Sequence, residues 1–452
     1  MNFGSIFKAY DVRGLCPGDF NVDSARSIGA AWARYLTDRD LGRQIVVGGD
    51  MRPTTGALIE ALAEGITAQG STAIVIGLCA TDQLYFASGW QHAPGIMVTA
   101  SHNPAAYNGM KFCLAGAGGV GLDTGLAQVR DLAAQGLIDV ASRGSRRNLD
   151  SLEAYVAHLH RLVDISDVRP LKVVVDAANG MAGHTVPAVF AGTNIEIVPL
   201  YFELDGTFPN HPADPLNPDN LVDLQAAVVR EGADLGLAFD GDADRCFVVD
   251  ERGGSVSPSA ISAMIAAREL ARVPGAAVVY NVITSQTVPE LVTELGGVAV
   301  RGKVGHSNMK ALMAQSQAIF GGEHSAHYYF RDFWNADTGM LAALHIIAAL
   351  GEANQPLSAL TSKYERYVAS GEINSTVLDA DGRIAAVRDL ARGQSGAHID
   401  ELDGVIVQYQ DRSRVSVRSS NTEPLLRLNV ESPTEVRMIE LRDQFLELIR
   451  AH

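Results

Sequence analysis

The sequence predicts an α/β protein built from three related α/β domains with mixed sheets and a smaller C-terminal α+β domain. Short apolar stretches of strand length alternate with amphipathic helices, which is typical of a parallel or mixed sheet covered on both faces. This alternation recurs three times along the chain, in similar order but without visible sequence repetition. The C-terminal part differs, because several strands there follow one another between two helices.

The first unit begins with an amphipathic helix whose apolar side chains recur at helical spacing, namely Ile28, Ala31, Trp32, Tyr35 and Leu36. Further elements are predicted as a strand at 45–47, a helix at 54–69 closed by Gly70, and strands at 72–76 and 96–99. The second and third units repeat this order with strands at 172–176 and 276–282 and helices from about 183 and at 286–295. The C-terminal part has predicted helices at 382–392 and from about 434, and strands at 405–409, 414–417 and 425–430.

Breaks in this pattern divide the chain into domains. They fall near 143–148, 251–258 and 364–371, where basic, glycine-containing or proline-containing segments interrupt the regular elements. The predicted domains are therefore 1–147, 148–254, 255–366 and 367–452.

Composition and charge exclude several classes of protein. The chain has 452 residues, of which 47% are hydrophobic and only 19% charged, which argues against intrinsic disorder. Its 36 basic and 52 acidic residues give a formal net charge of −16. An acidic balance disfavours nucleic acid or an anionic membrane as the main partner, but it does not exclude a small anionic substrate.

The cysteines and the apolar segments favour a cytoplasmic protein. Cys16, Cys79, Cys113 and Cys246 are far apart and form no C-x-x-C pair, so neither a disulfide framework nor a zinc site is expected. The start of the sequence lacks the pattern of a signal peptide. The most apolar stretch, 340–351, is far shorter than the roughly 20 residues that cross a bilayer.

A serine-containing turn is the first candidate site. The sequence Thr-Ala-Ser-His-Asn-Pro at 99–104 directly follows an apolar strand. Ser101 therefore lies at the carboxyl end of a strand, where open α/β sheets bind ligands. A plain turn with a capping serine is the alternative. The G-x-S-x-G elbow of hydrolases is absent, so an acyl-transfer serine is not supported.

A loop with three alternating carboxylates is the second candidate. Asp240, Asp242 and Asp244 lie in Asp-Gly-Asp-Ala-Asp-Arg at 240–245, between two apolar, strand-like segments. Such a loop can bring three oxygen ligands to one hard divalent cation, and few ligands suit Mg²⁺ that shares its shell with a phosphate. A solvated acidic turn and an EF-hand are the alternatives. The EF-hand fails because Arg245 stands where that loop requires glycine.

Two polar loops follow later in the chain. Glu323 and Ser325, in Gly-Gly-Glu-His-Ser-Ala-His at 321–327, can point the same way toward sugar hydroxyls, with a surface turn as the alternative. The segment 418–424, Arg-Ser-Ser-Asn-Thr-Glu-Pro, places a guanidinium beside hydroxyl and amide donors, as a phosphate dianion requires. An N-capping loop is the alternative there. Cationic segments around 10–14, 108–111 and 301–306 lie near these loops, although each alone is more often solvated charge.

In this order, the motifs resemble those of the α-D-phosphohexomutase superfamily, most closely its bacterial phosphomannomutases, including the dual phosphomannomutase/phosphoglucomutase type. The resemblance covers essentially the whole chain, and T-A-S-H-N-P together with D-G-D-A-D-R is its most specific part. It implies four domains around a central cleft, the fourth resembling the TATA-binding-protein fold.

The resemblance also implies roles for individual residues. Ser101 would be a phosphoserine that, with Asp240, Asp242 and Asp244, holds one Mg²⁺ per chain. Arg13, His102, Lys111 and Arg245 would surround the transferring phosphate. The implied substrate contacts are Tyr10, Lys303, His306, Glu323, Ser325, His327, Arg418, Ser420, Asn421, Thr422 and Arg427.

The implied reaction interconverts mannose 6-phosphate and mannose 1-phosphate, and also the glucose pair, through a hexose 1,6-bisphosphate that serves as intermediate and activator. Phosphoglucomutase or phosphoglucosamine mutase is the alternative within the enzymes, and a non-catalytic sugar-phosphate or divalent-ion binding protein is the alternative from another class. Lys111, Arg13 and His102 are the candidates for the general acid/base.

The expected assembly is a monomer or a weak homodimer. Two departures from the family pattern are Ala326, where many relatives have glycine, and Ile283, near a position that is basic in some.

Overall fold

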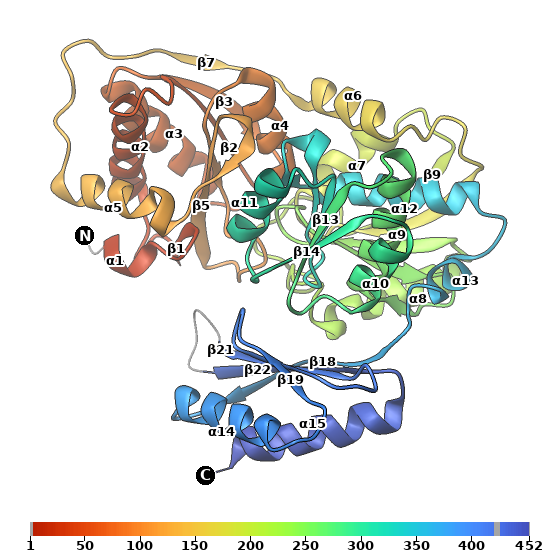
Figure 1. Ribbon diagram of the computed structural model, residues 1–452. Coiled ribbons are helices and arrows are strands. Elements are labelled where there is room, and N and C mark those ends of the chain that lie inside the picture. Colours follow the sequence, from red (N-terminus) through yellow and green to blue (C-terminus); the bar gives the residue numbers. More distant parts are fainter. Residues whose placement is uncertain (1–2, 420–424, 452) are drawn as a thin grey trace. The chain divides into compact units, whose positions relative to one another are not determined.

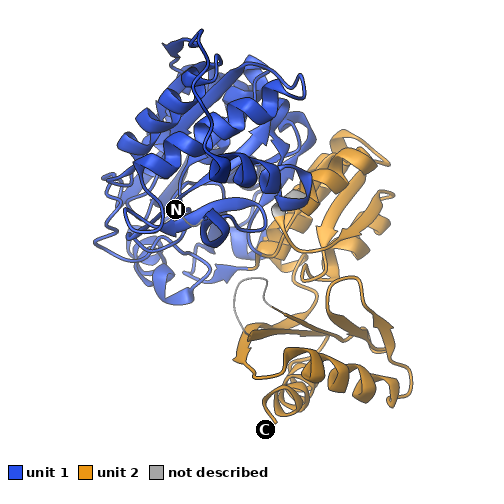
Figure 2. Ribbon diagram, turned by 90° about the vertical axis from the view of Figure 1, so that its left-hand side faces the viewer, with its two compact units in different colours: residues 1–256, 325–360 blue, residues 257–324, 361–452 orange. Residues whose placement is uncertain are grey.

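The computed structural model describes residues 3–419 and 425–451, apart from the side chains at 306 and 307. The chain divides into two compact units, each made of two separate segments (Figure 2). Unit 1 comprises residues 1–256 and 325–360, and unit 2 comprises residues 257–324 and 361–452. The segment 325–360 of the predicted third domain thus packs with unit 1. The predicted domain boundaries themselves stay predictions.

A mixed sheet forms the first domain, in the order β1-β5-β4-β2-β3-β7 (Figure 1). Its strands are β1 (Asp11–Leu15), β5 (Tyr107–Leu114), β4 (Gly95–Val98), β2 (Gln44–Gly49), β3 (Thr72–Leu78) and β7 (Arg146–Asn148), and β6 (Gly118–Gly119) pairs with β5. The four strands β2, β3, β4 and β7 run parallel, whereas β5 is antiparallel to β4 and β1. The carboxyl ends of β2 and β4 therefore lie at one edge, which carries Asp50 and Ser101.

Helices cover this sheet and bury its apolar side chains. They are α1 (Phe3–Ile6), α2 (Val22–Thr37), α3 (Thr55–Ala68), α4 (Thr81–Gln91) and α5 (Leu126–Gln135). Helix α2 begins in a capping box between Asn21 and Ser24. It buries Trp32, which stacks on Tyr35 and meets Phe112 of the sheet edge-on.

The second sheet has the order β12-β11-β10-β8-β9. Its strands are β12 (Ser255–Val256), β11 (Cys246–Asp250), β10 (Leu235–Phe239), β8 (Leu171–Asp176) and β9 (Ile195–Leu200), and the accompanying helices are α6 (Leu152–Leu162), α7 (Ala182–Phe190) and α8 (Val222–Glu231). Strands β10 and β11 are antiparallel neighbours, and the loop between them is the acidic segment 240–245. Residues 325–360 add β16 (Tyr328–Phe330), β17 (Ala336–Asp337) and the buried helix α12 (Gly339–Glu352) to unit 1, and α13 (Leu357–Ser362) follows.

Unit 2 contains a parallel group of strands and a separate antiparallel sheet. The parallel strands β13 (Ala277–Asn281), β14 (Val298–Gly302) and β15 (Phe320–Gly322) are accompanied by α9 (Pro258–Arg272), α10 (Thr287–Glu294) and α11 (His306–Ser316). The antiparallel sheet has the order β18-β22-β21-β20-β19. It consists of β18 (Val368–Thr376), β22 (Leu425–Ser432), β21 (Arg414–Ser419), β20 (Val405–Gln408) and β19 (His398–Asp400), and α14 (Ala380–Arg392) and α15 (Glu435–Arg450) lie together on one face of it (Figure 1).

The predicted fold class of three α/β domains and a smaller α+β domain is confirmed. The strand and helix predictions differ from the structure by a few residues at their ends. Strand β18 was missed because Val368–Thr376 contains Gly371, Glu372 and Asn374 rather than an apolar run. Within the described residues, no helix is both long and apolar enough to span a membrane.

Candidate active site

Ser101 is the third residue after β4 and lies in a left-handed backbone conformation, with φ of +49°. Its amide donates to Thr99 Oγ1 at 2.9 Å, and its hydroxyl donates to Asp240 Oδ2 at 2.8 Å. The residue is only 4% exposed. The structure therefore turns the Ser101 hydroxyl away from its own strand and toward the acidic loop of the second domain, as expected for a residue that shares a site with those carboxylates.

The acidic loop brings its three carboxylates together. Asp240, Asp242 and Asp244 offer oxygens that all lie within 4.8 Å of one another, and each residue is at most 1% exposed. The loop can turn this tightly because Ala243 takes a left-handed conformation, with φ of +61°. One oxygen each of Asp242 and Asp244, Oδ1 in both, is buried without a hydrogen-bond partner among the described residues. Open, buried carboxylate oxygens are what a divalent cation would use.

Two cations offset part of this charge. Lys111 on β5 donates to Asp242 Oδ2 at 2.7 Å and to Asp244 Oδ2 at 2.5 Å, and Arg245 Nε donates to Asp240 Oδ2 at 2.9 Å. Burial acts to lower the pKa of Lys111, but the neighbouring aspartates outweigh it and raise that pKa above its ordinary value. Burial and the charge of Asp242 raise the pKa of Asp244 to about 7. Lys111 and Arg245 do not fully neutralise the three carboxylates. The oxygen ligands of Asp240, Asp242 and Asp244 therefore fit a site for Mg²⁺.

Helix α4 supports the acidic loop from the first domain. Thr81, fully buried at the first position of this helix, donates from Oγ1 to Asp242 Oδ2 at 2.5 Å and from its amide to the Asp242 carbonyl at 3.0 Å. The next residue, Asp82, accepts from Tyr155 at 2.8 Å and from Thr338 at 2.7 Å. The start of α4 thus connects Asp242 to α6 and to the beginning of α12.

The other predicted cationic groups of unit 1 lie around the serine turn. Arg13 on β1 donates to Asn103 Oδ1 and pairs with Asp11 at 2.6 Å. His102 has its Nδ1 3.3 Å from Ser101 Oγ. Partial desolvation, Arg245 and Arg13 lower the pKa of His102 well below its ordinary value, although its ring still reaches solvent. Tyr10 is half-buried just before β1.

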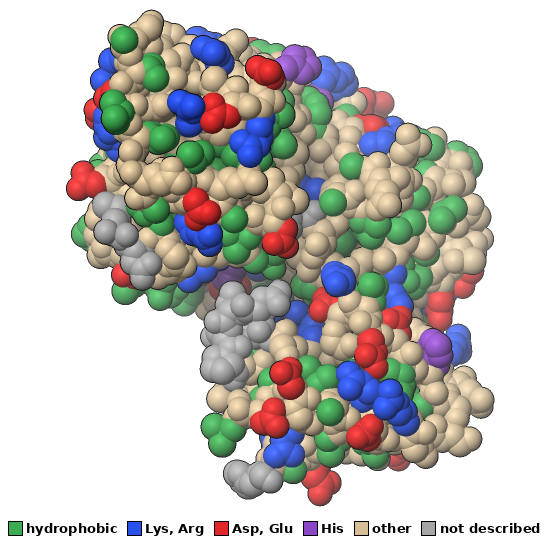
Figure 3. All heavy atoms as spheres, turned by 60° about the vertical axis from the view of Figure 1, so that its left-hand side comes forward, with side chains coloured by type: hydrophobic (Ala, Val, Ile, Leu, Met, Phe, Trp, Pro, Cys, Tyr) green, Lys and Arg blue, Asp and Glu red, His purple; other side chains and the backbone are tan. Residues whose placement is uncertain are grey.

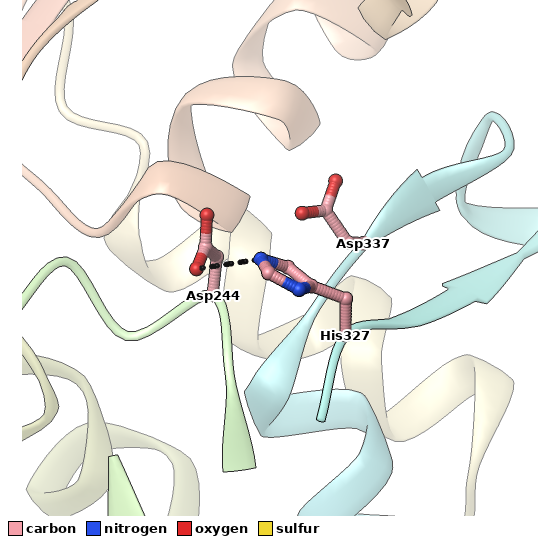
Figure 4. A group of neighbouring side chains, drawn as sticks. All are labelled: Asp244, His327 and Asp337. Atoms are coloured by element: carbon pink, nitrogen blue, oxygen red, sulfur yellow. Dashed lines mark ion pairs between the residues drawn. The ribbon is translucent and has the colours of Figure 1, made fainter. Parts of the chain in front are cut away.

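His327 joins the acidic loop from the returning segment of unit 1. Figure 4 shows its imidazole between the carboxylates of Asp244 and Asp337, which belongs to β17. Its Nε2 lies 3.6 Å from Asp244 Oδ1, and its Nδ1 lies 3.1 Å from Ser325 Oγ. A backbone bridge between Arg245 and His327 fixes this placement. The structure therefore groups the predicted residues Ser325 and His327 with the candidate metal ligands.

The remaining predicted residues belong to unit 2. Glu323, 2% exposed, accepts from Asn281 Nδ2 at 2.7 Å, while Lys303 is exposed. His306 begins α11, and its side chain is not among the described ones. Arg418 and Arg427 on neighbouring strands both pair with Glu372 of β18, at 3.0 and 3.2 Å. Their Nε groups are buried without a hydrogen-bond partner among the described residues, so each keeps a donor for an anion. Ser420, Asn421 and Thr422 lie outside the described residues.

Several site residues escaped the sequence analysis. Thr81 and Asp337 gave no local signal because their partners are distant in sequence. Asp50 and Arg52 did give one, since they are the first and third residues after an apolar strand, and Ser101 is likewise the third residue after its strand. Glu372 was missed together with its strand.

Charge is mixed on one face of the molecule. On the face drawn in Figure 3, basic and acidic side chains among the described residues alternate rather than gather by sign. This surface offers no broad cationic field to a polyanion.

Four family models match the chain in order. They describe the α/β/α domains I, II and III and the C-terminal domain of phosphoglucomutase/phosphomannomutase, at residues 4–135, 153–254, 258–367 and 372–448. A phosphomannomutase of Salmonella montevideo is 39% identical over 462 residues, covering 100% of both chains. A phosphohexose mutase of Xanthomonas campestris is 40% identical over 444 residues, covering 97% of each.

A solved structure shows the same architecture. The phosphoglucomutase/phosphomannomutase family protein of Burkholderia thailandensis has a TM-score of 0.90 and 32% identity, covering 99% of this chain and 97% of its own. Because all four domains match in order and the similarity extends along the whole chain, this protein belongs to the phosphoglucomutase/phosphomannomutase family of phosphohexomutases, as its motifs indicated.

Proposed function

We propose that this chain interconverts mannose 6-phosphate and mannose 1-phosphate, and also the glucose pair, with Ser101 as the phosphoryl carrier. The observation that carries the proposal is the Ser101 hydroxyl held 2.8 Å from Asp240, beside two further buried carboxylates and two cations. Phosphoryl transfer depends mainly on positioning and on charge neutralisation, and this arrangement supplies both.

One Mg²⁺ would be held by Asp240, Asp242 and Asp244 with the phosphate of Ser101, and it would neutralise charge on the transferring group. Around that site, Arg245 and Lys111 keep the carboxylates in place through the contacts given above. Arg13 fixes Asn103 of the serine turn and adds positive charge beside it. These residues bind and orient rather than react.

The first half-reaction forms a bond between a sugar hydroxyl oxygen and phosphorus and breaks the bond between phosphorus and Ser101 Oγ. The hydroxyl proton needs an acceptor. Lys111 and Arg13 are cations held by carboxylates, so neither is free to accept it. His327 is better suited, because a ring nitrogen of imidazole can accept a proton and the ring stands beside Asp244. In the second half-reaction Ser101 Oγ takes the other phosphoryl group from the hexose 1,6-bisphosphate, and His327 returns the proton.

The substrate contacts are proposed from unit 2. Glu323 would accept from sugar hydroxyls shared by mannose and glucose. Arg418 and Arg427 would bind the non-reacting phosphate through their open Nε donors, together with Lys303, His306 and the loop at 420–422. Because the bisphosphate must present each end in turn, these contacts have to accept two orientations of one sugar. The cytoplasmic location and the monomer or weak homodimer stay predictions.

The decisive experiment compares mannose, glucose and glucosamine 1-phosphates in steady state, with Mg²⁺ and a trace of glucose 1,6-bisphosphate. We expect the highest kcat/KM for mannose 1-phosphate and measurable turnover of glucose 1-phosphate. Ser101→Ala should lose at least about a thousandfold in kcat, while the control Ser27→Ala, on the exposed face of α2, should retain it. Preference for glucosamine 1-phosphate would contradict the assignment, and binding without turnover of any sugar would favour the non-catalytic alternative.

A further inference from the structure

Arg52 lies at the edge of the first domain's sheet that also carries Ser101, and it donates to the Ser101 carbonyl. It follows β2 by three residues, and its side chain and that of Asp50 are both 0% exposed. Asp50 accepts from Arg52 Nε at 3.2 Å and from the Arg52 amide at 3.1 Å, and Thr55 donates to the same carboxylate at 2.8 Å. The guanidinium is therefore fixed at its base by a buried ion pair.

The four remaining donors of this guanidinium all reach the serine turn. Nη2 donates to the carbonyls of Ser101 at 2.9 Å and Asn103 at 2.6 Å. Nη1 donates to the carbonyls of Pro104 and Tyr107, both at 2.9 Å. With Asp50 on Nε, all five N–H groups are used, which is the full capacity of an arginine.

The turn satisfies these carbonyls only in part by itself, since among them the Pro104 carbonyl also accepts from the Tyr107 amide at 3.0 Å. Ser101 has a positive φ, which L-residues rarely adopt, so its conformation depends on its surroundings. The contact to the Ser101 carbonyl is buried, where a missing partner is costly, and the same side chain also serves three part-buried carbonyls. The ring of Phe208, 5.1 Å from the guanidinium carbon, and the backbone at Gly206 lie over Arg52 from the second domain.

We infer that Arg52 is a positioning residue for phosphoryl transfer: it holds the backbone from Ser101 to Tyr107 in the one conformation that directs the Ser101 hydroxyl at Asp240. This inference rests on the proposed function of Ser101 for its catalytic consequence, but not for its structural part. Arg52 itself touches no reacting atom. Lysine cannot replace it, since an ammonium presents three donors from a single point rather than five in a planar fork.

The test compares Arg52→Lys and Arg52→Gln with the wild type and with Ile66→Ala. Ile66 is a fully buried core residue of α3 that contacts none of these groups, and its truncation supplies a control of reduced stability. Three quantities are measured: hydrogen–deuterium exchange of the peptide 99–108, Mg²⁺ affinity by calorimetry, and the rate at which glucose 1,6-bisphosphate phosphorylates Ser101. Steady-state kcat and KM with mannose 1-phosphate complete the set.

For Arg52→Lys we expect at least tenfold faster exchange in 99–108, about fiftyfold slower phosphorylation of Ser101, and KM and Mg²⁺ affinity within about threefold of wild type. Ile66→Ala should lower Tm, but it should not combine faster exchange in 99–108 and slower phosphorylation of Ser101 with an unchanged KM and Mg²⁺ affinity. Wild-type exchange and phosphorylation in both Arg52 variants would overturn the inference, as would an equal kinetic loss in Ile66→Ala. Faster exchange in every peptide of both variants would make Arg52 a residue of global stability and would also overturn it. If wild-type Ser101 is not phosphorylated at all, the proposed function fails, and exchange in 99–108 still decides whether Arg52 holds the turn.

Discussion

Gly241 lies directly against Ser101: a Cβ at Gly241 would come 2.5 Å from the Ser101 carbonyl oxygen. This oxygen is the one that Arg52 Nη2 binds. The two loops, one from each of the first two domains, therefore meet backbone to backbone, and the missing side chain of glycine sets their distance.

Gly241→Ala should separate these loops and reduce kcat by at least about a hundredfold, because the Ser101 hydroxyl would lose its place beside Asp240. A small change in Tm is expected, since the loops and not the cores move. The measurement is kcat together with Mg²⁺ affinity. Gly56→Ala, at a glycine of α3 where an added Cβ meets nothing within 4 Å and φ is not positive, is the control for fold. Full activity in Gly241→Ala would show that the close approach is not required.

Thr81→Val removes the hydroxyl that donates to Asp242 Oδ2 while it preserves shape. This hydroxyl orients a carboxylate proposed to hold Mg²⁺, and loss of such a support typically weakens metal binding about ten- to a hundredfold. Calorimetric titration of Mg²⁺ measures this without reference to activity. Thr81→Ser keeps the hydroxyl and should bind almost as the wild type does. Equal affinities in the valine and serine variants would refute the role of this hydroxyl.

His327→Asn should reduce kcat by at least about a hundredfold, because imidazole is the group proposed to take the hydroxyl proton and asparagine cannot. Steady-state kcat with mannose 1-phosphate checks this. Mg²⁺ affinity, measured by calorimetry, serves as the control that the neighbouring carboxylates are unchanged. A variant with wild-type kcat would assign the proton transfer to another group.

Asp82 should make the folded protein less stable as the pH rises from about 4 to 7. Burial raises the pKa of Asp82 from 3.8 to about 7, so the folded state binds this proton more tightly than the unfolded chain does. Its contribution to stability is complete below about pH 4 and is lost as the pH passes through 7, with a slope of at most about 1.4 kcal/mol per pH unit. Asp82→Asn cannot titrate and should show a flatter dependence. Urea unfolding of both proteins at pH 4.5, 6 and 7.5, at constant Mg²⁺, measures the difference. Parallel curves would contradict the assignment.

The sequence could predict those parts of the site that lie in short, polar runs after apolar strands. Ser101 and the aspartates at 240–244 stand in such runs. The spacing of the aspartates predicted a cation site, whereas the phosphoserine role of Ser101 was implied only by the family resemblance. Their supports could not be found in this way, because Thr81 acts on a residue 161 positions away and Asp337 belongs to a short strand. Arg52 falls between these cases: its place after a strand was visible, but the four carbonyls it binds depend on a backbone conformation that no spacing reveals.

The contacts of Arg418 show a related limit of prediction from the sequence: here the motif was visible, but its acidic partner on another strand was not. The polar run around this arginine predicted a phosphate-binding loop, and the run itself carries no acidic partner before Glu423. In the structure, Glu372 of β18 pairs with both Arg418 and Arg427. Part of the cationic charge is therefore already offset within the sheet, which a count of arginines could not show.

Residues 325–360 pack with unit 1 although they follow a segment of unit 2 in the sequence, so part of unit 1 is synthesised late. As the chain leaves the ribosome, Ser101 emerges long before Asp240, and His327 and the α12 cap at Thr338 come later still. The first domain can fold as each segment appears, but its serine meets no complete charge environment until more than two thirds of the chain has been synthesised. A chain that ends before His327 would therefore carry the serine turn without the complete set of charged groups that the proposed function assigns to it.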